Sequence, residues 1–328
     1  MRRTRQAAMR ISTSRTRGDR SAGGADRGPE RRGRRGAWRR WSRPCRLRCL
    51  RCVGGAGRTG SELVRVERRC GETATQGAPP GRGRVLLTGG TGRLGTELCR
   101  LIGGLTAPTH AEMDVTDSAA VDAFVGACRP DVIVHAAAFT NVSAAERDRE
   151  LCWHVNVRGT RNIVRASMDH HARLVHISTD YVFDGGRGMY EEDDVPGPVC
   201  NFYALSKLAA EEVVRLAPRS LVIRTSFRPR EWPYPTAFTD VYTSQDYVDV
   251  NAPEIALAVT NLGSVPDGTL HIATERKSVY ELARRRRPDV RAGTRDAAGV
   301  VLPADISLNV SRWQSLRQLL RVRSAPES

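Results

Sequence analysis

The sequence contains, at residues 84–95, the stretch RVLLTGGTGRLG. Its apolar start predicts a short buried strand over 84–88, and the residues after it predict a helix from Thr96 to about Gly103. A strand, a glycine loop and a helix in this order are typical of a dinucleotide-binding unit, in which the amino end of the helix faces a pyrophosphate. The stretch therefore predicts an α/β fold.

The glycines of this loop follow the spacing G-x-x-G-x-x-G. We expect Gly89 to allow the tight turn, Gly92 to let the backbone approach a pyrophosphate, and Gly95 to let helix and strand pack closely. A glycine-rich turn without a ligand has a similar composition, so the loop alone is a weak signal. The residues expected to bind the cofactor here are Gly89, Thr91, Gly92, Arg93, Leu94 and Gly95.

The segments that follow alternate between predicted helices and strands, as in a Rossmann-like doubly wound parallel sheet. Helices are expected at 118–128, 151–168 and 252–262, and strands at 131–135, 173–177, 220–225 and 269–273. Asp114 and Val115 are expected to end a further strand. Because ligands bind at the carboxyl ends of parallel strands, we expect Thr91, Ala137 and Thr179 to face one crevice with the start of the Tyr203 helix.

Tyr203 and Lys207 are four residues apart in the stretch YALSK, so on a helix they share one face. Of the 52 lysine and arginine residues in the chain only two are lysines, Lys207 and Lys277. A nearby ammonium lowers the pKa of a phenol, which can then exchange a proton with a carbonyl or hydroxyl oxygen. An ordinary pair on a solvated helix has the same spacing, so this prediction depends on the upstream motifs.

The positive charge of the chain is concentrated in its first quarter. Residues 1–82 carry 23 arginines and six acidic residues, whereas residues 83–328 carry 29 basic and 30 acidic residues. The first segment is rich in Arg, Gly and Ser and lacks an apolar period, which predicts a disordered basic extension. The near-neutral remainder has no basic footprint for nucleic acid, so we do not expect it to bind one.

Three functional alternatives remain open for residues 1–82. The segment could be a nucleic-acid arm in which Trp38 and Trp41 stack on bases, or an organelle transit peptide. A metal site is the third alternative, and its candidate ligands are Cys45, Cys49, Cys52 and Cys70. Their spacing does not repeat the paired pattern of a zinc ribbon, so we predict no metal. We favour a dispensable tail or a mis-assigned translation start.

The chain shows no secretory signal and no apolar run near 18 residues, so we predict a cytoplasmic protein without a membrane span. The remaining cysteines are scattered singly, which suits reduced thiols, and they are Cys99, Cys128, Cys152 and Cys200. The adjacent His170 and His171 are not expected to bind a metal, because neighbours on a helix point to different faces.

Taken together, the motifs resemble those of the short-chain dehydrogenase/reductase superfamily and, more narrowly, of the dTDP-4-dehydrorhamnose reductase family. In order they are GGTGRLG at 89–95, RPDVIVHAAAFT at 129–140, STDYVFDG at 178–185, YALSK at 203–207 and RTS at 224–226. The resemblance covers roughly residues 84–227, and STDYVF is its most specific part.

This resemblance implies a catalytic set of Thr179, Tyr203 and Lys207. Thr179 would hydrogen-bond the substrate carbonyl oxygen, and Tyr203 would donate the proton. Lys207 would lower the pKa of Tyr203 and hold the ribose hydroxyls of the nicotinamide. NAD(P)H would deliver a hydride to a keto carbon of a nucleotide-linked sugar.

Further site residues follow from the resemblance alone. Asp114 and Val115 would lie beside the adenine, and Asn156 would support the active-site helix. The other implied cofactor residues are Ala136, Ala137, Ala138 and Ser178, and the implied substrate residues are Thr140, Asp180, Tyr181 and Phe183. For the cofactor we favour NADP, because Arg93 is placed to meet a 2′-phosphate. NAD is the alternative, because Glu112 falls where an acid binds the ribose.

The chain also departs from this family. Residues 83–328 are fewer than we expect, and the shortage follows Ser226. Three prolines in 228–236 argue against the helix that helps to cover the sugar nucleotide. Substrate-binding segments are expected mainly in 184–200, 227–262 and 286–328, as a small part after the cofactor half. The exact sugar therefore cannot be carried over.

Two other functions remain open. An epimerase or dehydratase of the same superfamily would keep its cofactor bound and use the same Tyr203–Lys207 pair. A cofactor-binding regulatory subunit without turnover would resemble the regulatory subunit of methionine adenosyltransferase. A homodimer is suggested by the resemblance alone.

Overall fold

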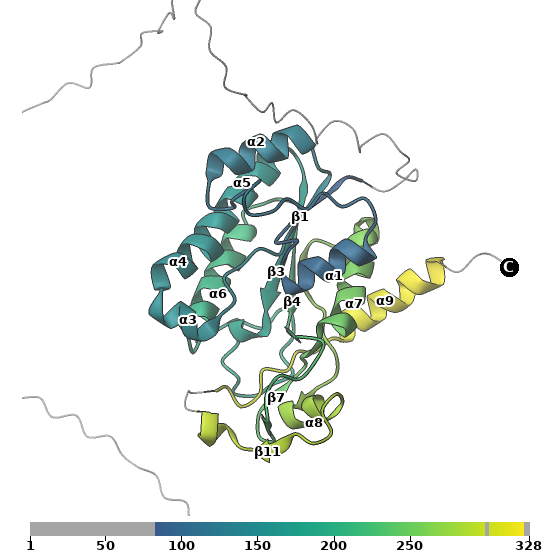
Figure 1. Cartoon of the computed structure of the whole chain (residues 1–328). Coiled ribbons are helices and arrows are strands. Elements are labelled where there is room, and N and C mark those ends of the chain that lie inside the picture. The colour runs from purple at the N-terminus through teal and green to yellow at the C-terminus, as the bar shows by residue number, and fades with distance from the viewer. Residues whose placement is uncertain (1–82, 299–301, 325–328) are drawn as a thin grey trace, which may run out of the picture. The chain divides into compact units, whose positions relative to one another are not determined.

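The computed structural model describes residues 83–298 and 302–324 (Figure 1). These residues belong to one compact unit of the chain. The predictions for residues 1–82, including disorder, the nucleic-acid arm and the cysteine metal site, lie outside the described residues. Within the described part of the chain, no helix combines the length and the apolar character that crossing a bilayer requires.

A five-stranded parallel sheet forms the centre of this unit. Its strands, in spatial order, are β1 (Val85–Thr88), β2 (Val132–His135), β3 (Arg173–Thr179), β4 (Ser220–Thr225) and β9 (Gly268–His271). Each neighbouring pair is parallel, so all five carboxyl ends lie at one edge. The predicted α/β parallel sheet is confirmed.

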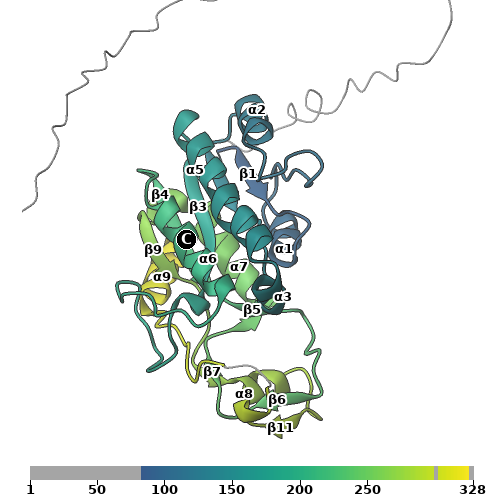
Figure 2. The ribbon, with the colours of Figure 1, turned by 90° about the vertical axis from the view of Figure 1, so that its left-hand side faces the viewer.

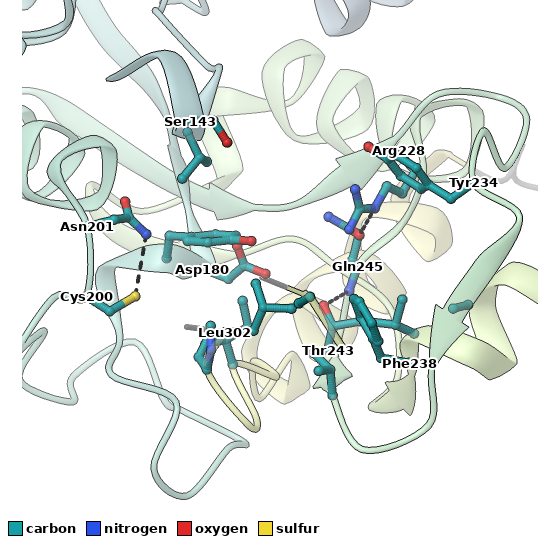
Figure 3. A pocket seen from close by; sticks show the side chains of 18 of the residues that line it. Ser143, Asp180, Cys200, Asn201, Arg228, Tyr234, Phe238, Thr243, Gln245 and Leu302 are labelled. Carbon is teal, nitrogen blue, oxygen red and sulfur yellow. Dashed lines mark hydrogen bonds between the residues drawn. The ribbon is translucent and has the colours of Figure 1, made fainter. Parts of the chain in front are cut away.

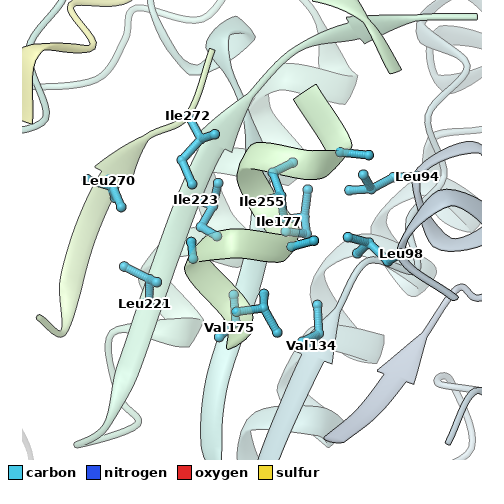
Figure 4. Packing of buried hydrophobic residues seen from close by; sticks show 14 of the residues in the cluster. Leu94, Leu98, Val134, Val175, Ile177, Leu221, Ile223, Ile255, Leu270 and Ile272 are labelled. Atoms are coloured by element: carbon cyan, nitrogen blue, oxygen red, sulfur yellow. The ribbon is translucent and has the colours of Figure 1, made fainter. Parts of the chain in front are cut away.

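Helices cover both faces of the sheet, as Figures 1 and 2 show. On one face lie α1 (Arg93–Leu101), α7 (Val248–Thr260) and α9 (Ser311–Ser324), and on the other α2 (Ser118–Cys128), α5 (Thr160–Asp169) and α6 (Phe202–Val214). In the first layer, Leu98 and Ile255 pack with Ile177 (Figure 4). Each such buried aliphatic side chain stabilises the fold by about 1.5–3 kcal/mol.

The segment between α1 and α2 differs from the prediction. Asp114 and Val115 do not end a strand, and only Thr106 bridges to β1, where its carbonyl accepts the N–H of Leu87 at 2.8 Å. The connection is short, and Pro108 lacks the N–H that a longer ladder needs. The predicted strand is therefore replaced by irregular chain.

The predicted helix at 151–168 contains an irregular turn. The chain forms α3 (Val142–Arg147), then α4 (Arg149–Trp153), a π-helical turn at His154–Gly159, and α5. π-helical turns inside helices are frequent at functional sites. Here the turn carries Asn156, which is fully buried.

A smaller lobe follows the sheet and lies at the bottom of Figure 1. It contains α8 (Val279–Arg284) and short strand pairs: β6 (Thr236–Phe238) with β11 (Arg291–Gly293), and β7 (Tyr242–Thr243) with β10 (Lys277–Ser278). A third pair, β5 (Phe227–Arg228) with β8 (Asp246–Tyr247), connects it to the sheet half. As the prolines predicted, residues 229–235 are not helical.

Candidate active site and adjoining pocket

The glycine loop packs tightly between β1 and the end of β2. Gly89 has a φ of +74°, and a β-carbon there would lie 2.7 Å from the backbone nitrogen of Ala137. A β-carbon on Gly95 would lie 2.1 Å from the carbonyl oxygen of Gly89. Both positions therefore require glycine, one for the turn and both for close approach.

The amino end of α1 begins at this loop. Gly92 caps the helix, and its N–H donates to the Gly89 carbonyl at 2.9 Å. The N–H groups of the first turn and the positive end of the helix dipole make this end suitable for a phosphate group. The Arg93 side chain is exposed beside it and makes no ion pair within the described part of the chain. Glu112, the acid that would favour NAD, accepts hydrogen bonds from the backbone and hydroxyl of Thr109 at 2.8 and 2.9 Å.

The other predicted cofactor residues divide into two groups. The half-buried Ala136, Ala137 and Ala138 follow β2 next to the glycine loop. Asp114 instead caps the local turn at Thr116, at 2.8 Å, and Val115 packs in the core. The Ser178 hydroxyl donates to the buried Glu211, so it could only accept a hydrogen bond from a cofactor.

The structure brings the three predicted catalytic residues together. Thr179 ends β3, while Tyr203 and Lys207 lie on one face of α6, which Asn201 caps through the N–H of Ala204. The Thr179 hydroxyl donates to Asp180 at 3.0 Å and is also hydrogen-bonded to Tyr203. All three side chains are buried. Their catalytic roles remain predictions.

Burial shifts the pKa values of both Tyr203 and Lys207. Burial raises the pKa of Tyr203, and the neighbouring Asp180 and Tyr181 raise it further. The ammonium of Lys207 donates to the carbonyl of Ile177 at 2.8 Å and to His176 Nε2 at 3.1 Å. Burial lowers the pKa of Lys207 to about 8. Neither of these two hydrogen bonds goes to Tyr203, and the lowering of the Tyr203 pKa by Lys207 stays a prediction.

Asn156 connects three parts of the site. Its amide accepts the N–H of Phe139 at 2.7 Å and donates to the Phe139 carbonyl at 3.1 Å. It also donates to the Ser206 hydroxyl on α6 at 2.9 Å. The π-helical turn thus holds the chain after β2 against the helix that carries Tyr203, in the supporting place predicted for Asn156.

A large pocket of about 1030 Å³ adjoins this set (Figure 3). Its walls come from α3 and α4, the start of α6, the segment after β4, Ala298, and the chain at 302–306. Parts of the three predicted substrate segments contribute to it, for example Val199, Thr236 and Pro303. Of the predicted substrate residues, Asp180 and Tyr181 line it.

Two predicted substrate residues do not line this pocket. Thr140 is exposed and lies outside the pocket lining. Phe183 is buried in a core cluster, where its ring stacks on Tyr190 with centroids 4.2 Å apart. The resemblance pointed to Phe183 through its motif, but its position in the chain turns the ring into the core.

A polar chain crosses the pocket floor and includes residues that the sequence analysis missed. Asp180 is hydrogen-bonded to Ser226, which accepts from Gln245 Nε2 at 2.7 Å. Gln245 Oε1 in turn accepts from Arg228 Nε at 2.6 Å (Figure 3). Burial raises the pKa of Asp180 to about 7.

Arg228 is held by aromatic rings as well. Its guanidinium lies 5.4 Å from the Trp232 ring centre and 5.8 Å from that of Tyr234. It makes no ion pair with any residue that the structure describes. The mixture of arginine, aromatic residues and prolines at 228–236 was the only sequence signal for this cluster.

His170 and His171 lie in different surroundings. His170 caps the carboxyl end of α5, and its Nε2 lies 3.3 Å from Asp122 Oδ1. His171 follows in a left-handed conformation with a φ of +57°. Across residues 83–298 and 302–324, no group of three metal-ligating side chains is present.

Comparison with known proteins identifies related chains. The family model described as the RmlD substrate binding domain matches residues 83–250. A dTDP-4-dehydrorhamnose reductase from Aggregatibacter actinomycetemcomitans is 37% identical over 151 residues, which are 44% of this chain and 51% of that protein. The chain thus spans about half the length of the curated relatives it matches.

Two solved structures named as dTDP-4-dehydrorhamnose reductases are also similar to this chain. A dTDP-4-dehydrorhamnose reductase from Bacillus anthracis in complex with NADP aligns with a TM-score of 0.64 at 25% identity, over 74% of this chain and all of that one. A hypothetical dTDP-4-dehydrorhamnose reductase from Sulfolobus tokodaii aligns with a TM-score of 0.61 at 34% identity, over 71% of this chain and 94% of that one.

Proposed function

Because the chain belongs to the family of the RmlD substrate binding domain, we propose that it is an NADPH-dependent reductase of a nucleotide-linked keto-deoxysugar. The observation that carries the proposal is the buried contact between Thr179 and Tyr203, with Lys207 on the same helix face, beside a pocket large enough for a nucleotide sugar. Relatives named as reductases of dTDP-linked keto sugars support the same class of reaction.

The residues present fit a dinucleotide. The glycine loop would hold the pyrophosphate at the amino end of α1, where Gly92 keeps the approach open. Arg93 would pair with a 2′-phosphate, since Glu112 is engaged with Thr109. These two side chains favour NADP over NAD, as does the NADP in the related structure from Bacillus anthracis.

When bound, a reduced nicotinamide supplies a hydride to the keto carbon. Tyr203 would donate its phenolic proton to the carbonyl oxygen, and its raised pKa keeps that proton in place at neutral pH. The Thr179 hydroxyl would donate a hydrogen bond to the same oxygen and stabilise the charge that develops there. Lys207 would hold the ribose hydroxyls and favour the tyrosinate that remains.

The pocket supplies a place for the rest of the substrate. Among the described residues Arg228 has no ion-pair partner there, and it is held in one orientation by Gln245 and by the Trp232 ring. A guanidinium in such a position suits a diphosphate, which it can bind with two parallel hydrogen bonds. We therefore assign the diphosphate of the nucleotide sugar to Arg228.

The decisive experiment titrates the protein with NADPH and NADH by fluorescence. A dTDP-linked 4-keto-6-deoxysugar is then added, and the absorbance of the reduced nicotinamide is followed. Tight NADPH binding followed by substrate-dependent oxidation is the expected result. Binding without oxidation would instead favour an epimerase or a regulatory subunit, and no binding of either nucleotide would contradict the reading of the glycine loop.

A further inference from the structure

Two histidines lie side by side inside the central sheet. His135 on β2 and His176 on β3 are partners in the strand register, and their ring centres are 5.3 Å apart. Neither is more than 1% exposed. A polar side chain buried this deeply requires hydrogen-bond partners, and those partners define its role.

His135 has both ring nitrogens satisfied by neighbouring threonines. The Thr160 hydroxyl donates to the Asn156 carbonyl at 2.6 Å, so it can only accept from His135 Nε2, at 3.0 Å. The Thr88 hydroxyl then donates to His135 Nδ1 at 2.8 Å. His135 is thus a neutral structural residue, and burial lowers its pKa to about 3.

His176 has a different partner. Its Nε2 faces the ammonium of Lys207 at 3.1 Å, while Nδ1 has no partner within the described part of the chain. Because the ammonium has only donors, Nε2 must accept and the ring proton must sit on Nδ1. Burial and the adjacent ammonium lower the pKa of His176, which keeps the ring neutral and able to accept.

The other charged and titratable groups near Lys207 come from three elements. They are Tyr203 and Glu211 on α6, Cys152 on α4, and His135 on β2. Glu211 stabilises the ammonium at a distance, but its carboxylate is bonded to Arg224 and Ser178. Direct hydrogen bonds from the ammonium go only to His176 and to the Ile177 carbonyl among the residues that the structure describes.

We propose that His176 is a positioning residue for Lys207. Its neutral imidazole accepts one N–H of the ammonium, and the Ile177 carbonyl accepts a second. The third N–H is then directed toward Tyr203 and the cofactor ribose. The link to catalysis rests on the proposed function. The contact also stabilises the charged form of Lys207, which burial disfavours. Replacing His176 by a side chain of similar size that cannot accept a hydrogen bond should make the charged form of Lys207 less stable.

The two-lysine composition allows a direct test. Protein containing lysine labelled with carbon-13 at Cε gives NMR signals from Lys207 and Lys277 alone, and Lys277 serves as the internal reference. In the unaltered protein we expect Lys207 to titrate near pH 8. In His176→Phe its pKa should fall by about 1–2 units. In His176→Gln, whose amide oxygen can accept, it should stay near the original value.

His176→Met provides a second apolar variant with a more adaptable side chain, in case the Phe variant does not fold. An unchanged Lys207 pKa in the apolar variants, or an equal fall in His176→Gln, would overturn the proposal. As the pH is raised in turnover assays, the apolar variants should lose activity at a lower pH than the original protein does. If the unaltered protein turns over no keto sugar, the proposed function fails, while the NMR titration still decides the role of His176.

Discussion

Arg224 on β4 and Glu211 on α6 form an ion pair in which both side chains are fully buried, with Nη2 and Oε2 2.8 Å apart. The Arg224 Nε adds a second bond to Glu211 at 3.1 Å, and the Ser178 hydroxyl a third. Glu211 lies one helical turn beyond Lys207. The pair therefore fixes the helix that carries Tyr203 and Lys207 to the two central strands.

Replacing Glu211 by Gln should strongly destabilise the protein. The change leaves Arg224 as a buried charge without a counter-ion, and breaking such a pair costs about 3–5 kcal/mol. Urea unfolding at neutral pH measures the free energy of unfolding of each variant directly. Glu212→Gln is the matched control, since the side chain of Glu212 is 64% exposed and pairs only at the surface with Arg215. Equal losses in the two variants would contradict a special role for the buried pair.

Tyr203→Phe should lower turnover by at least about 100-fold while NADPH binding stays within about twofold. The variant removes the phenolic proton and the contact with Thr179 but keeps the ring in its buried place. Steady-state rates and fluorescence titration measure the two properties separately. Tyr280→Phe on α8, outside the pocket lining, controls for the loss of a phenol elsewhere. Unchanged turnover in Tyr203→Phe would end its assignment as the proton donor.

Gly92→Val should abolish NADPH binding without unfolding the chain. Gly92 is exposed and has an ordinary φ, and among the described residues a β-carbon there meets only the Gly89 carbonyl, at 3.1 Å. The branched side chain would instead occupy the path of the pyrophosphate to the amino end of α1. Gly103→Ala is the control, because a β-carbon at Gly103 meets no described atom within 4 Å. Tight NADPH binding by Gly92→Val would place the phosphates elsewhere.

The sequence predicted the elements that local patterns determine. Helix α2 occupies the predicted residues 118–128, because Asp117 caps it through the N–H groups of Ala119 and Ala120 and the left-handed Arg129 ends it. Strand β4 likewise matches its predicted residues 220–225. These signals lie within a few residues of the boundaries that they set.

The parts that the sequence did not predict depend on contacts between distant segments. Arg228 acquires its orientation from Gln245, 17 residues away, and His176 acquires its partner from Lys207, 31 residues away. A polar residue in an apolar strand signals that a partner exists but does not identify it. Phe183 shows the converse, since its motif matched the family while its ring packs in the core.

Asp180 should make stability depend on pH. Its pKa in the fold is about 7, raised by burial from 3.8, so the folded chain binds a proton that the unfolded chain has lost between these values. Stability from this group is fully present below about pH 4 and is lost as pH rises through 7. Asp180→Asn should therefore gain stability relative to the original protein between pH 5 and 8, by roughly 2–3 kcal/mol. Urea unfolding at pH 5 and at pH 8 measures the free energy of unfolding of both proteins. If the two proteins differ in it by the same amount at both pH values, the pKa of Asp180 is not raised.

Arg228→Gln should weaken substrate binding selectively. Loss of a hydrogen-bonded charge from the pocket should raise the KM for the nucleotide sugar roughly 10- to 100-fold, while the Kd for NADPH changes little. Calorimetric titration with dTDP alone gives the same information without turnover. The neutral side chain keeps a donor for Gln245, so the pocket floor should stay in place.

Arg187→Gln is the matched control for this prediction. Arg187 also stacks on a tyrosine, with its guanidinium 5.1 Å from the Tyr190 ring centre, but it lies outside the pocket lining. The Arg187→Gln variant should bind dTDP with the same affinity as the original protein. If Arg228→Gln also keeps its affinity for dTDP, the diphosphate must be bound elsewhere. Arg149 would then be the next candidate, because it lines the same pocket and pairs with Glu146 at 2.8 Å.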